Sequence, residues 1–236
     1  MIDLLEVQDI KKKFKRKKVL EGVTFKAKKG EITALVGLNG EGKSTLFKII
    51  MDIVRKDSGE VLLDGEKVNY KTYEKLAFVP DVLNTYSNMT IKDSFDYMEV
   101  MYKRWDKNKA YNMLRDFKLK DDLKINKLSK GNIARVKLIL GFARNPEYLL
   151  LDEPFSGIDI FTREKFIESL IEYINEDICI LLTTHELKEV ENIVDKVVLL
   201  SKGKIKCEFY VEEERELEGL SMIEKIREVQ ESEEEF

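Results

Sequence analysis

The chain has 236 residues, of which 36% are charged, and its formal net charge is only -4. A chain of this length can bury a sizeable core without disulfides or a structural metal, and its mixed charges give no indication of a nucleic-acid partner. The two cysteines, Cys179 and Cys207, have neither metal-ligand spacing nor the density of a disulfide scaffold, which favours reduced thiols in an intracellular protein.

The first 80 residues are predicted to form short strands joined by turns. Apolar segments bounded by turn residues predict strands over residues 2–7, 23–27, 31–36, 59–63, 67–68 and 77–79. The third strand leads into a Gly-rich turn and a helix predicted over residues 43–53, and Asp64-Gly65 predicts a tight hairpin turn. The very basic residues 11–18 are interpreted as a solvated hairpin rather than as a site for anionic lipid or nucleic acid.

The next stretch, residues 82–144, is predicted to be an inserted helical lobe. Its apolar residues recur at helical spacing, as in Phe95, Met98, Met101, Tyr102, Tyr111, Leu114 and Phe117. Strands are predicted again over residues 148–151, 178–183 and 197–200, with helices between them, and this alternation favours a largely parallel sheet. One of these helices has an apolar face made of Phe161, Phe166, Ile167, Leu170, Ile171 and Ile174.

These elements predict a single α/β domain with two discontinuous parts. The core comprises about residues 1–80 and 145–210, and the lobe comprises about residues 82–144. An acidic tail follows from residue 211 to residue 236, with Leu220, Ile223, Ile226 and Val229 on one helical face. A solvated helix docked on the domain is favoured over a regulatory tail.

A phosphate-binding loop is predicted at residues 37–45, which fit the pattern G-x-x-x-x-G-K-[ST] between a strand and a helix. Glycines allow the backbone N–H groups to approach phosphate closely, and the helix adds its positive N-terminal end. The lysine would meet the β and γ phosphates, and the serine hydroxyl would bind Mg²⁺. The predicted nucleotide contacts are Gly37, Asn39, Gly40, Gly42, Lys43, Ser44 and Thr45.

Two acids follow the apolar strand at residues 148–151, and they predict the catalytic end of the site. In a parallel sheet this strand would lie near the strand that precedes the phosphate loop, which places Asp152 near Mg²⁺. Glu153 would then orient and deprotonate the attacking water beside the γ-phosphate. A GTPase is disfavoured, because the nearest match to Asn-Lys-x-Asp, beginning at Asn126, ends in Ser129.

At this point the sequence resembles the ATP-binding cassette (ABC) ATPase family along nearly its whole length. The residues Leu128-Ser129-Lys130-Gly131-Asn132 lie where the family has its LSGGQ signature, and Ser156-Gly157-Ile158-Asp159 resembles its D-loop. The resemblance further implies that His185 is the switch histidine and that Phe14 stacks on adenine, with plain packing as the alternative for Phe14. The expected fold is a P-loop NTPase core with a mostly parallel sheet, an N-terminal antiparallel β subdomain and an inserted helical subdomain.

The resemblance also implies a dimer that holds two ATP molecules between its subunits. Each site would pair one subunit's phosphate loop with Ser129 and Gly131 of the other, and Asp159 would contribute to the nucleotide site. Ser129 and Gly131 precede an expected helix, so a hydroxyl and free N–H groups could face the γ-phosphate. The partner would be a second copy or a homologous ATPase.

Four positions depart from the family pattern. Lys130 and Asn132 replace Gly and Gln in the signature, and Glu41 is a milder change within the phosphate loop. Asp81 follows Pro80 where the family has a Gln, in the loop through which such ATPases sense transmembrane partners. We hypothesise that Asp81 binds Mg²⁺ through a carboxylate oxygen; the alternative is that it faces solvent or the permease.

The favoured function is the ATP-hydrolysing motor of a transporter. Asp3 and Glu6 interrupt any early signal-like run, and no run approaches the roughly 18 apolar residues that span a bilayer, so a separately encoded permease is expected. The chain would be cytoplasmic, peripheral on the inner face of the cell membrane, and would serve export rather than import. The alternative is a soluble ABC assembly factor or clamp. An inactive regulator is disfavoured by four intact site residues, Lys43, Asp152, Glu153 and His185.

Overall fold

The computed structural model describes residues 4–82, 88–173 and 177–231, which form two β-sheets and the helices around them. The larger sheet has the strand order β10-β9-β3-β8-β7-β6. Its strands are β3 (Ile32–Val36), β6 (Leu76–Val79), β7 (Tyr148–Asp152), β8 (Cys179–Thr184), β9 (Lys196–Ser201) and β10 (Lys204–Tyr210). All neighbouring pairs are parallel except β9 and β10. The predicted largely parallel sheet is confirmed.

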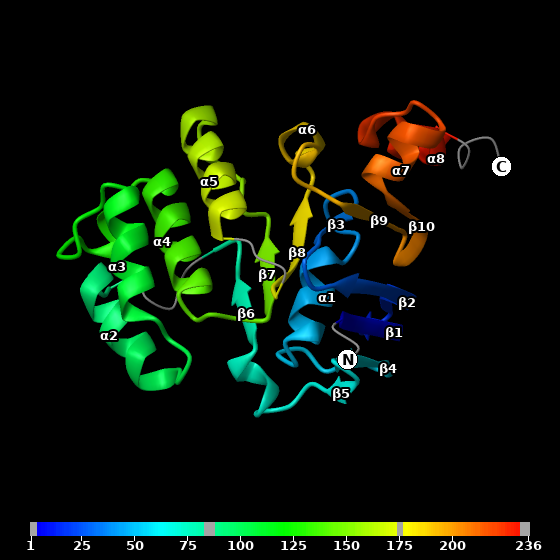
Figure 1. Ribbon diagram of the computed structural model, residues 1–236. Helices are drawn as coiled ribbons and strands as arrows, with labels where there is room; N and C mark the ends of the chain where they lie inside the picture. Colours follow the sequence, from blue (N-terminus) through cyan, green and yellow to red (C-terminus); the bar gives the residue numbers. More distant parts are fainter. Residues whose placement is uncertain (1–3, 83–87, 174–176, 232–236) are drawn as a thin grey trace.

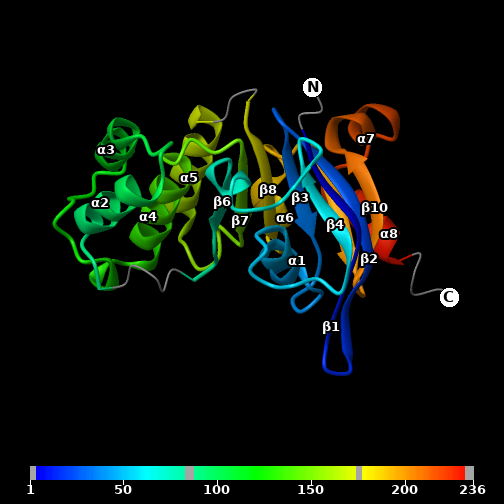
Figure 2. The ribbon, with the colours of Figure 1, turned by 90° about the horizontal axis from the view of Figure 1, so that it is seen from below.

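The second sheet is antiparallel and has the order β2-β1-β4-β5. Its strands are β1 (Leu4–Phe14), β2 (Lys17–Lys28), β4 (Ser58–Leu63) and β5 (Glu66–Lys67). The predicted hairpin turn is confirmed, since Asp64 and Gly65 have φ angles of 52° and 80°. The basic residues 11–18 lie inside the β1–β2 hairpin, which is longer than predicted and extends beyond the rest of the molecule (Figure 2).

Helix α1 (Lys43–Ile50) lies between the two sheets and places the phosphate loop at the carboxyl end of β3 (Figure 1). Its buried residues Leu46, Phe47, Ile49 and Ile50 belong to one apolar cluster with residues from both sheets. The helix ends earlier than the predicted residue 53, because Asp52 takes a positive φ of 53° that a helix cannot continue.

The opposite face of the larger sheet is covered by the remaining helices. Three of them form a lobe beside edge strand β6 (Figure 1): α2 (Ile91–Met101), α3 (Lys107–Asp116) and α4 (Lys130–Phe142). Short 3-10 turns lie at Thr72–Glu74 and Ile125–Lys127, and α5 (Ile160–Tyr173) and α6 (Leu187–Val190) follow β7 and β8. The buried apolar residues on this face of the sheet form one hydrophobic cluster with those of the lobe. Alternate residues of each strand point into it, as Ile32, Ala34 and Val36 do on β3.

The C-terminal region differs from the sequence prediction in two respects. Strand β10 was not predicted, and the single predicted tail helix is two helices, α7 (Val211–Leu217) and α8 (Met222–Glu231). Gly219, with a φ of 69°, lies between them. Helix α8 is docked on the domain through the buried Met222 and Ile226.

Some predicted positions fall outside the described part of the chain. These are residues 2 and 3 of the first predicted strand, Ile174, residues 83–87 of the lobe and residues 232–236 of the tail, together with the side chains of Phe161 and Phe166. Within the described ranges, no helix is both long enough and apolar enough to cross a bilayer.

Candidate active site

The phosphate loop is built by close packing that only glycine permits at two positions. A Cβ at Gly37 would lie 2.3 Å from the main-chain oxygen of Leu200, on β9. A Cβ at Gly42, whose φ is 105°, would lie 2.9 Å from Leu20 and 3.0 Å from Val19, at the start of β2. The loop is therefore held between β9 and β2 with its main chain in the shape that a phosphate cradle requires.

Lys43 is buried at the start of α1 and points back into the loop. Its Nζ atom donates hydrogen bonds to the main-chain oxygens of Gly37 at 2.6 Å and Leu38 at 3.3 Å. The same ammonium lies 3.5 Å from Oε1 of Glu153, at the end of β7. One cation thus connects the loop to the predicted general base across two elements that are distant in sequence.

Ser44 and Asp152 also come together as predicted from the sequence. The Ser44 hydroxyl donates to Oδ1 of Asp152 at 3.0 Å, and the Thr183 hydroxyl donates to the same oxygen at 2.8 Å. Burial raises the pKa of Asp152, the hydrogen bonds from Thr183 and Ser44 lower it, and the charges of Glu153 and Asp81 raise it further. The carboxylate therefore lies in a place where a cation would be favourable.

A hydroxyl and a carboxylate are hard oxygen ligands, which fits Mg²⁺, an ion that typically uses one or two carboxylates together with nucleotide phosphates. In the described part of the chain no group of three or more His, Cys, Asp or Glu residues could hold a metal. This arrangement is compatible with a metal that needs the nucleotide for the rest of its coordination.

Thr183 is the residue of this site that the sequence reasoning missed. Besides bonding to Asp152, its hydroxyl oxygen accepts a hydrogen bond from the main-chain N–H of Glu153 at 2.9 Å. The register of the sheet explains this, since Thr183 on β8 lies directly beside Asp152 on β7. A polar residue at the carboxyl end of an otherwise apolar strand was the signal that could have identified it.

Glu153 and His185 are in direct contact. Oε2 of Glu153 lies 2.8 Å from Nδ1 of His185, which follows the end of β8. Glu153 has a φ of 45°, an unfavourable conformation for a non-glycine residue that often accompanies function. Lys43 and His185 therefore contact the two oxygens of one carboxylate, which fixes its orientation.

Asp81 is exposed, and the hydrogen bond that the structure shows at this residue involves its main-chain oxygen, which accepts from Lys137 Nζ at 2.7 Å. Its charge nevertheless contributes to the raised pKa of Asp152. The structure thus places Asp81 within electrostatic reach of Asp152. Its direct binding of a metal remains a prediction.

The predicted signature residues lie in the lobe, away from the phosphate loop of the same chain. Ser129 caps α4 by accepting a hydrogen bond from the N–H of Asn132 at 3.3 Å, and Gly131 lies in the first turn. Helix α4 flanks β6, whereas the phosphate loop follows β3, and strands β7 and β8 lie between them (Figure 1).

The remaining predicted contacts lie around the edges of the site. Asn39 and Gly40 are exposed at the tip of the loop, and Thr45 is half-buried in α1. Phe14 is 47% exposed at the end of β1, with Lys12 Nζ 5.0 Å from the centre of its ring. Asp159 precedes α5, and its main-chain oxygen accepts from the N–H of Arg163 at 3.0 Å. Val19 and Leu20, rather than Phe14, are the residues of this hairpin that approach Gly42.

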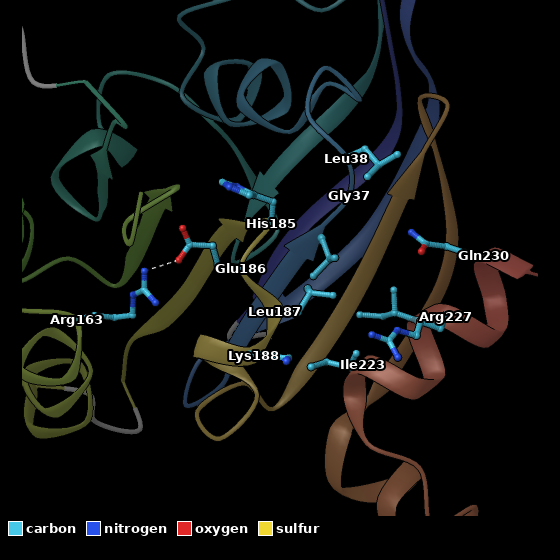
Figure 3. Close-up of a pocket in the computed structure, with 12 residues that line it drawn as sticks. Gly37, Leu38, Arg163, His185, Glu186, Leu187, Lys188, Ile223, Arg227 and Gln230 are labelled. Carbon is cyan, nitrogen blue, oxygen red and sulfur yellow. Dashed lines mark ion pairs between the residues drawn. The ribbon is translucent and has the colours of Figure 1, made fainter. Parts of the chain in front are cut away.

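A cleft of about 570 Å³ opens beside the site, between the phosphate loop and the C-terminal helix (Figure 3). Its walls include Leu38 and His185 on one side and Arg227 and Gln230 of α8 on the other. Glu186 is turned toward α5, where it pairs with Arg163 at 2.7 Å. Helix α8 therefore forms part of the surface next to His185.

Comparisons with known proteins agree with this geometry. The sequence model of the ABC transporter family matches residues 20–156. The ABC transporter ATP-binding protein YtrB of Bacillus subtilis is 30% identical over 86% of this chain and 70% of its own length. A solved structure described as the ATP-binding subunit of an ABC transporter is 29% identical, with a TM-score of 0.83 over 96% of this chain and 99% of that chain.

Other relatives carry names that refer to opposite directions of transport. The lipopolysaccharide export system ATP-binding protein LptB of Haemophilus influenzae is 27% identical over 86% of this chain and 89% of its own length. The zinc uptake system ATP-binding protein ZurA of Listeria innocua is 31% identical over 86% of this chain and 84% of its own length.

Proposed function

The chain belongs to the ABC transporter family and is an ATP-binding, ATP-hydrolysing subunit, and on this premise we propose that two copies close around ATP to drive a separately encoded membrane permease. The observation that carries the proposal is the continuous set of contacts from Lys43 through Glu153 to His185, next to the Ser44–Asp152 pair. A nucleotide bound to the phosphate loop would contact the Lys43–Glu153–His185 set and the Ser44–Asp152 pair at the same time.

In the proposed reaction, each of these residues has a separate role. Lys43 leaves Glu153 and binds the β and γ phosphates, which frees the carboxylate to take a proton from the attacking water. His185 keeps the carboxylate oriented and donates toward the γ-phosphate. Ser44 and Asp152 would hold Mg²⁺, which supplies positive charge that stabilises the transferring phosphoryl group.

The need for a second subunit follows from the distance between the two halves of the expected site. Helix α4 has 13 residues, and the N–H groups of its first turn point away from its own body at Ser129 and Gly131. Such a helix start favours an anion, but the phosphate loop of the same chain lies beyond strands β7 and β8. We propose that α4 of one subunit completes the nucleotide site of the other, which is either the same chain or a homologous ATPase.

For the permease, we propose a docking groove between the core and the lobe. This groove of about 270 Å³ is largely apolar, with Phe78, Val79, Pro80 and Met98 among its lining residues. Ile53, which lines it, is 63% exposed, so its side chain is accessible to a segment seated in the groove. A permease segment seated there would place the chain on the inner face of the cell membrane.

We propose export as the direction of transport, supported by the similarity to LptB, whereas the similarity to ZurA favours uptake. Transport in reconstituted vesicles, with ATP supplied on the side of this subunit, separates the two directions.

The experiment for the permease partnership uses a matched pair of surface variants. Ile53→Asp places a charge in the groove, whereas Leu217→Asp changes a residue of α7 that is 83% exposed. With the permease expressed alongside, we expect Ile53→Asp to lose co-purification from mild detergent and Leu217→Asp to retain it. Equal recovery of the permease with both variants would contradict docking at this groove, and an active chain that never recovers a membrane protein would favour the soluble assembly ATPase.

A further inference from the structure

Lys137 is a buried lysine at the junction between the lobe and the core. It lies on α4, only 7% of its surface is exposed, and its Nζ atom donates a hydrogen bond to the main-chain oxygen of Asp81 at 2.7 Å. The neighbouring residues of this helix, Val136 and Leu138, are fully buried apolar side chains. A lysine in such a position is uncommon, because the ammonium must be hydrogen-bonded or paired to be tolerated.

Lys137 lines two cavities. It lines the apolar groove of about 270 Å³ that contains Pro80 and Phe78. It also lines a cleft of about 440 Å³ whose walls include Asp81, Pro154 and Gly157. One side chain thus borders the proposed docking groove and the loop that follows the catalytic carboxylates.

The charges around Lys137 belong to the catalytic site. Burial lowers the pKa of this lysine, whereas the charges of Asp81 and Asp152 raise it. The ammonium therefore lies near two carboxylates that repel one another, and the charge of Asp81 is among the causes that raise the pKa of Asp152. Lys43 is likewise a buried lysine beside a carboxylate of the site, that of Glu153.

We propose that Lys137 is a positioning residue for ATP hydrolysis, which holds the main chain of Asp81 and thereby sets where the Asp81 carboxylate lies relative to Asp152. This inference rests on the proposed role of Asp81 in the site. The bond to the main chain, rather than to the carboxylate, leaves the Asp81 oxygens available for the metal or the attacking water.

The test is a cycle of variants made in the full chain. Lys137→Met removes the ammonium and keeps the length of the side chain, and we expect kcat to fall about tenfold with KM for ATP within about twofold, because misplaced catalytic groups affect turnover more than nucleotide binding. Lys137→Arg keeps a cation and donor groups, and it should recover most of the lost turnover. In an Asp81→Ala background, Lys137→Met should change kcat by less than about twofold, because the group that Lys137 positions is already absent.

Lys109→Met is the matched control, since Lys109 is another partly buried lysine of the lobe, whose Nζ atom binds the side chain of Asn145 at 3.0 Å. Hydrogen exchange of the peptide containing Pro80–Val82, in the nucleotide-free protein, gives a readout that does not depend on activity. We expect faster exchange there in Lys137→Met than in the parent or in Lys109→Met.

The outcomes separate this inference from the proposal on which it rests. If Asp81→Ala hydrolyses ATP at the parent rate, the proposed role of Asp81 is wrong. If Asp81→Ala is impaired but Lys137→Met is not, or if Lys137→Met is equally harmful with and without Asp81, the positioning role alone is overturned. Should the methionine variant fail to fold, Lys137→Gln, which keeps an N–H donor on a shorter side chain, is subjected to the same cycle and the same criteria.

Discussion

Replacement of Glu153 by glutamine should separate nucleotide binding from hydrolysis. The substitution keeps the shape of the side chain but removes the base that we place beside the γ-phosphate. Loss of a general base typically costs a factor of about 10²–10⁴ in rate, which corresponds to about 3–5 kcal/mol of transition-state stabilisation. The fold should survive, because Lys43 keeps its hydrogen bonds to the main-chain oxygens of Gly37 and Leu38.

Nucleotide binding should be retained in this variant. One negative charge disappears from a site that already contains Asp152, so the repulsion of the γ-phosphate decreases. Without hydrolysis the closed pair of subunits has no route to reopen, and ATP-bound dimers should accumulate. Steady-state phosphate release measures the rate, and gel filtration with Mg²⁺ and ATP measures the dimer.

The matched control is Glu186→Gln, in which the carboxylate lost is the partner of Arg163 rather than of Lys43. We expect its rate to stay within about threefold of the parent, in contrast to the large loss at Glu153. If Glu153→Gln hydrolyses ATP at the parent rate, another group activates the water and the assignment of Glu153 is refuted.

Three further variants test the site and the fold that supports it. Lys43→Ala should abolish turnover and weaken ATP binding, measured by calorimetry with Mg²⁺, by at least about tenfold, because it removes the cation at the β and γ phosphates. Unchanged affinity would contradict the assignment of the phosphate-binding loop. Asp81→Gln should need more Mg²⁺ for half-maximal ATPase rate than the parent, because it removes a negative charge whose repulsion with the other carboxylates is relieved when the cation binds; superimposed Mg²⁺ curves would show that Asp81 does not bind the metal. Burial raises the pKa of Glu147, but its bonds to Arg104 and Lys29 lower it more, to about 2. Its contribution is therefore present above pH 4.5 and is lost as the pH falls toward 2, so Glu147→Gln should reduce the free energy of unfolding by about 1–2 kcal/mol at pH 7, after allowance for solvent screening, and by less at pH 3. A loss that does not change with pH would contradict this.

The candidate site could be predicted from the sequence because its residues follow strands that were themselves recognisable. Asp152 and His185 each come at or just after the carboxyl end of an apolar strand, and in a parallel sheet these ends meet at one edge. Ser44 follows a loop whose glycine spacing, between a strand and a helix, is typical of phosphate binding. Local patterns were therefore sufficient to bring Ser44, Asp152 and Glu153 to one place, whereas His185 was added by the family resemblance.

What the sequence could not provide depends on contacts between distant segments. Strand β10 alternates Ile205, Cys207 and Phe209 with charged residues, and its pairing with β9 becomes evident only from the register. The roles of Thr183 and Lys137 follow from their neighbours on other elements, since a single polar residue in an apolar strand or helix does not indicate what it contacts.

The predicted ends of the β1–β2 hairpin and of the tail helix were also wrong. Residues 11–18 of the long β1–β2 hairpin, which extends away from the core, are basic except for Phe14, so hydrophobicity gave no signal for the ends of these strands. In the tail, the helical face predicted from Leu220 to Val229 is present on α8 at Ile223, Ile226 and Val229, but Leu220 lies before that helix and the residues before Gly219 form the separate helix α7.

The measurement that tests the two-subunit site most directly mixes two inactive variants. Lys43→Ala damages the phosphate loop, and Ser129→Arg places a bulky cation at the start of α4, so neither variant should hydrolyse ATP alone. Mixed in equal amounts, they should recover about a quarter of the parent rate, because half of randomly paired dimers are mixed and each mixed dimer keeps one of its two sites intact. If mixed dimers form, as detected by affinity tags on each variant, and the mixture stays as inactive as its components, then α4 of one subunit does not complete the nucleotide site of the other.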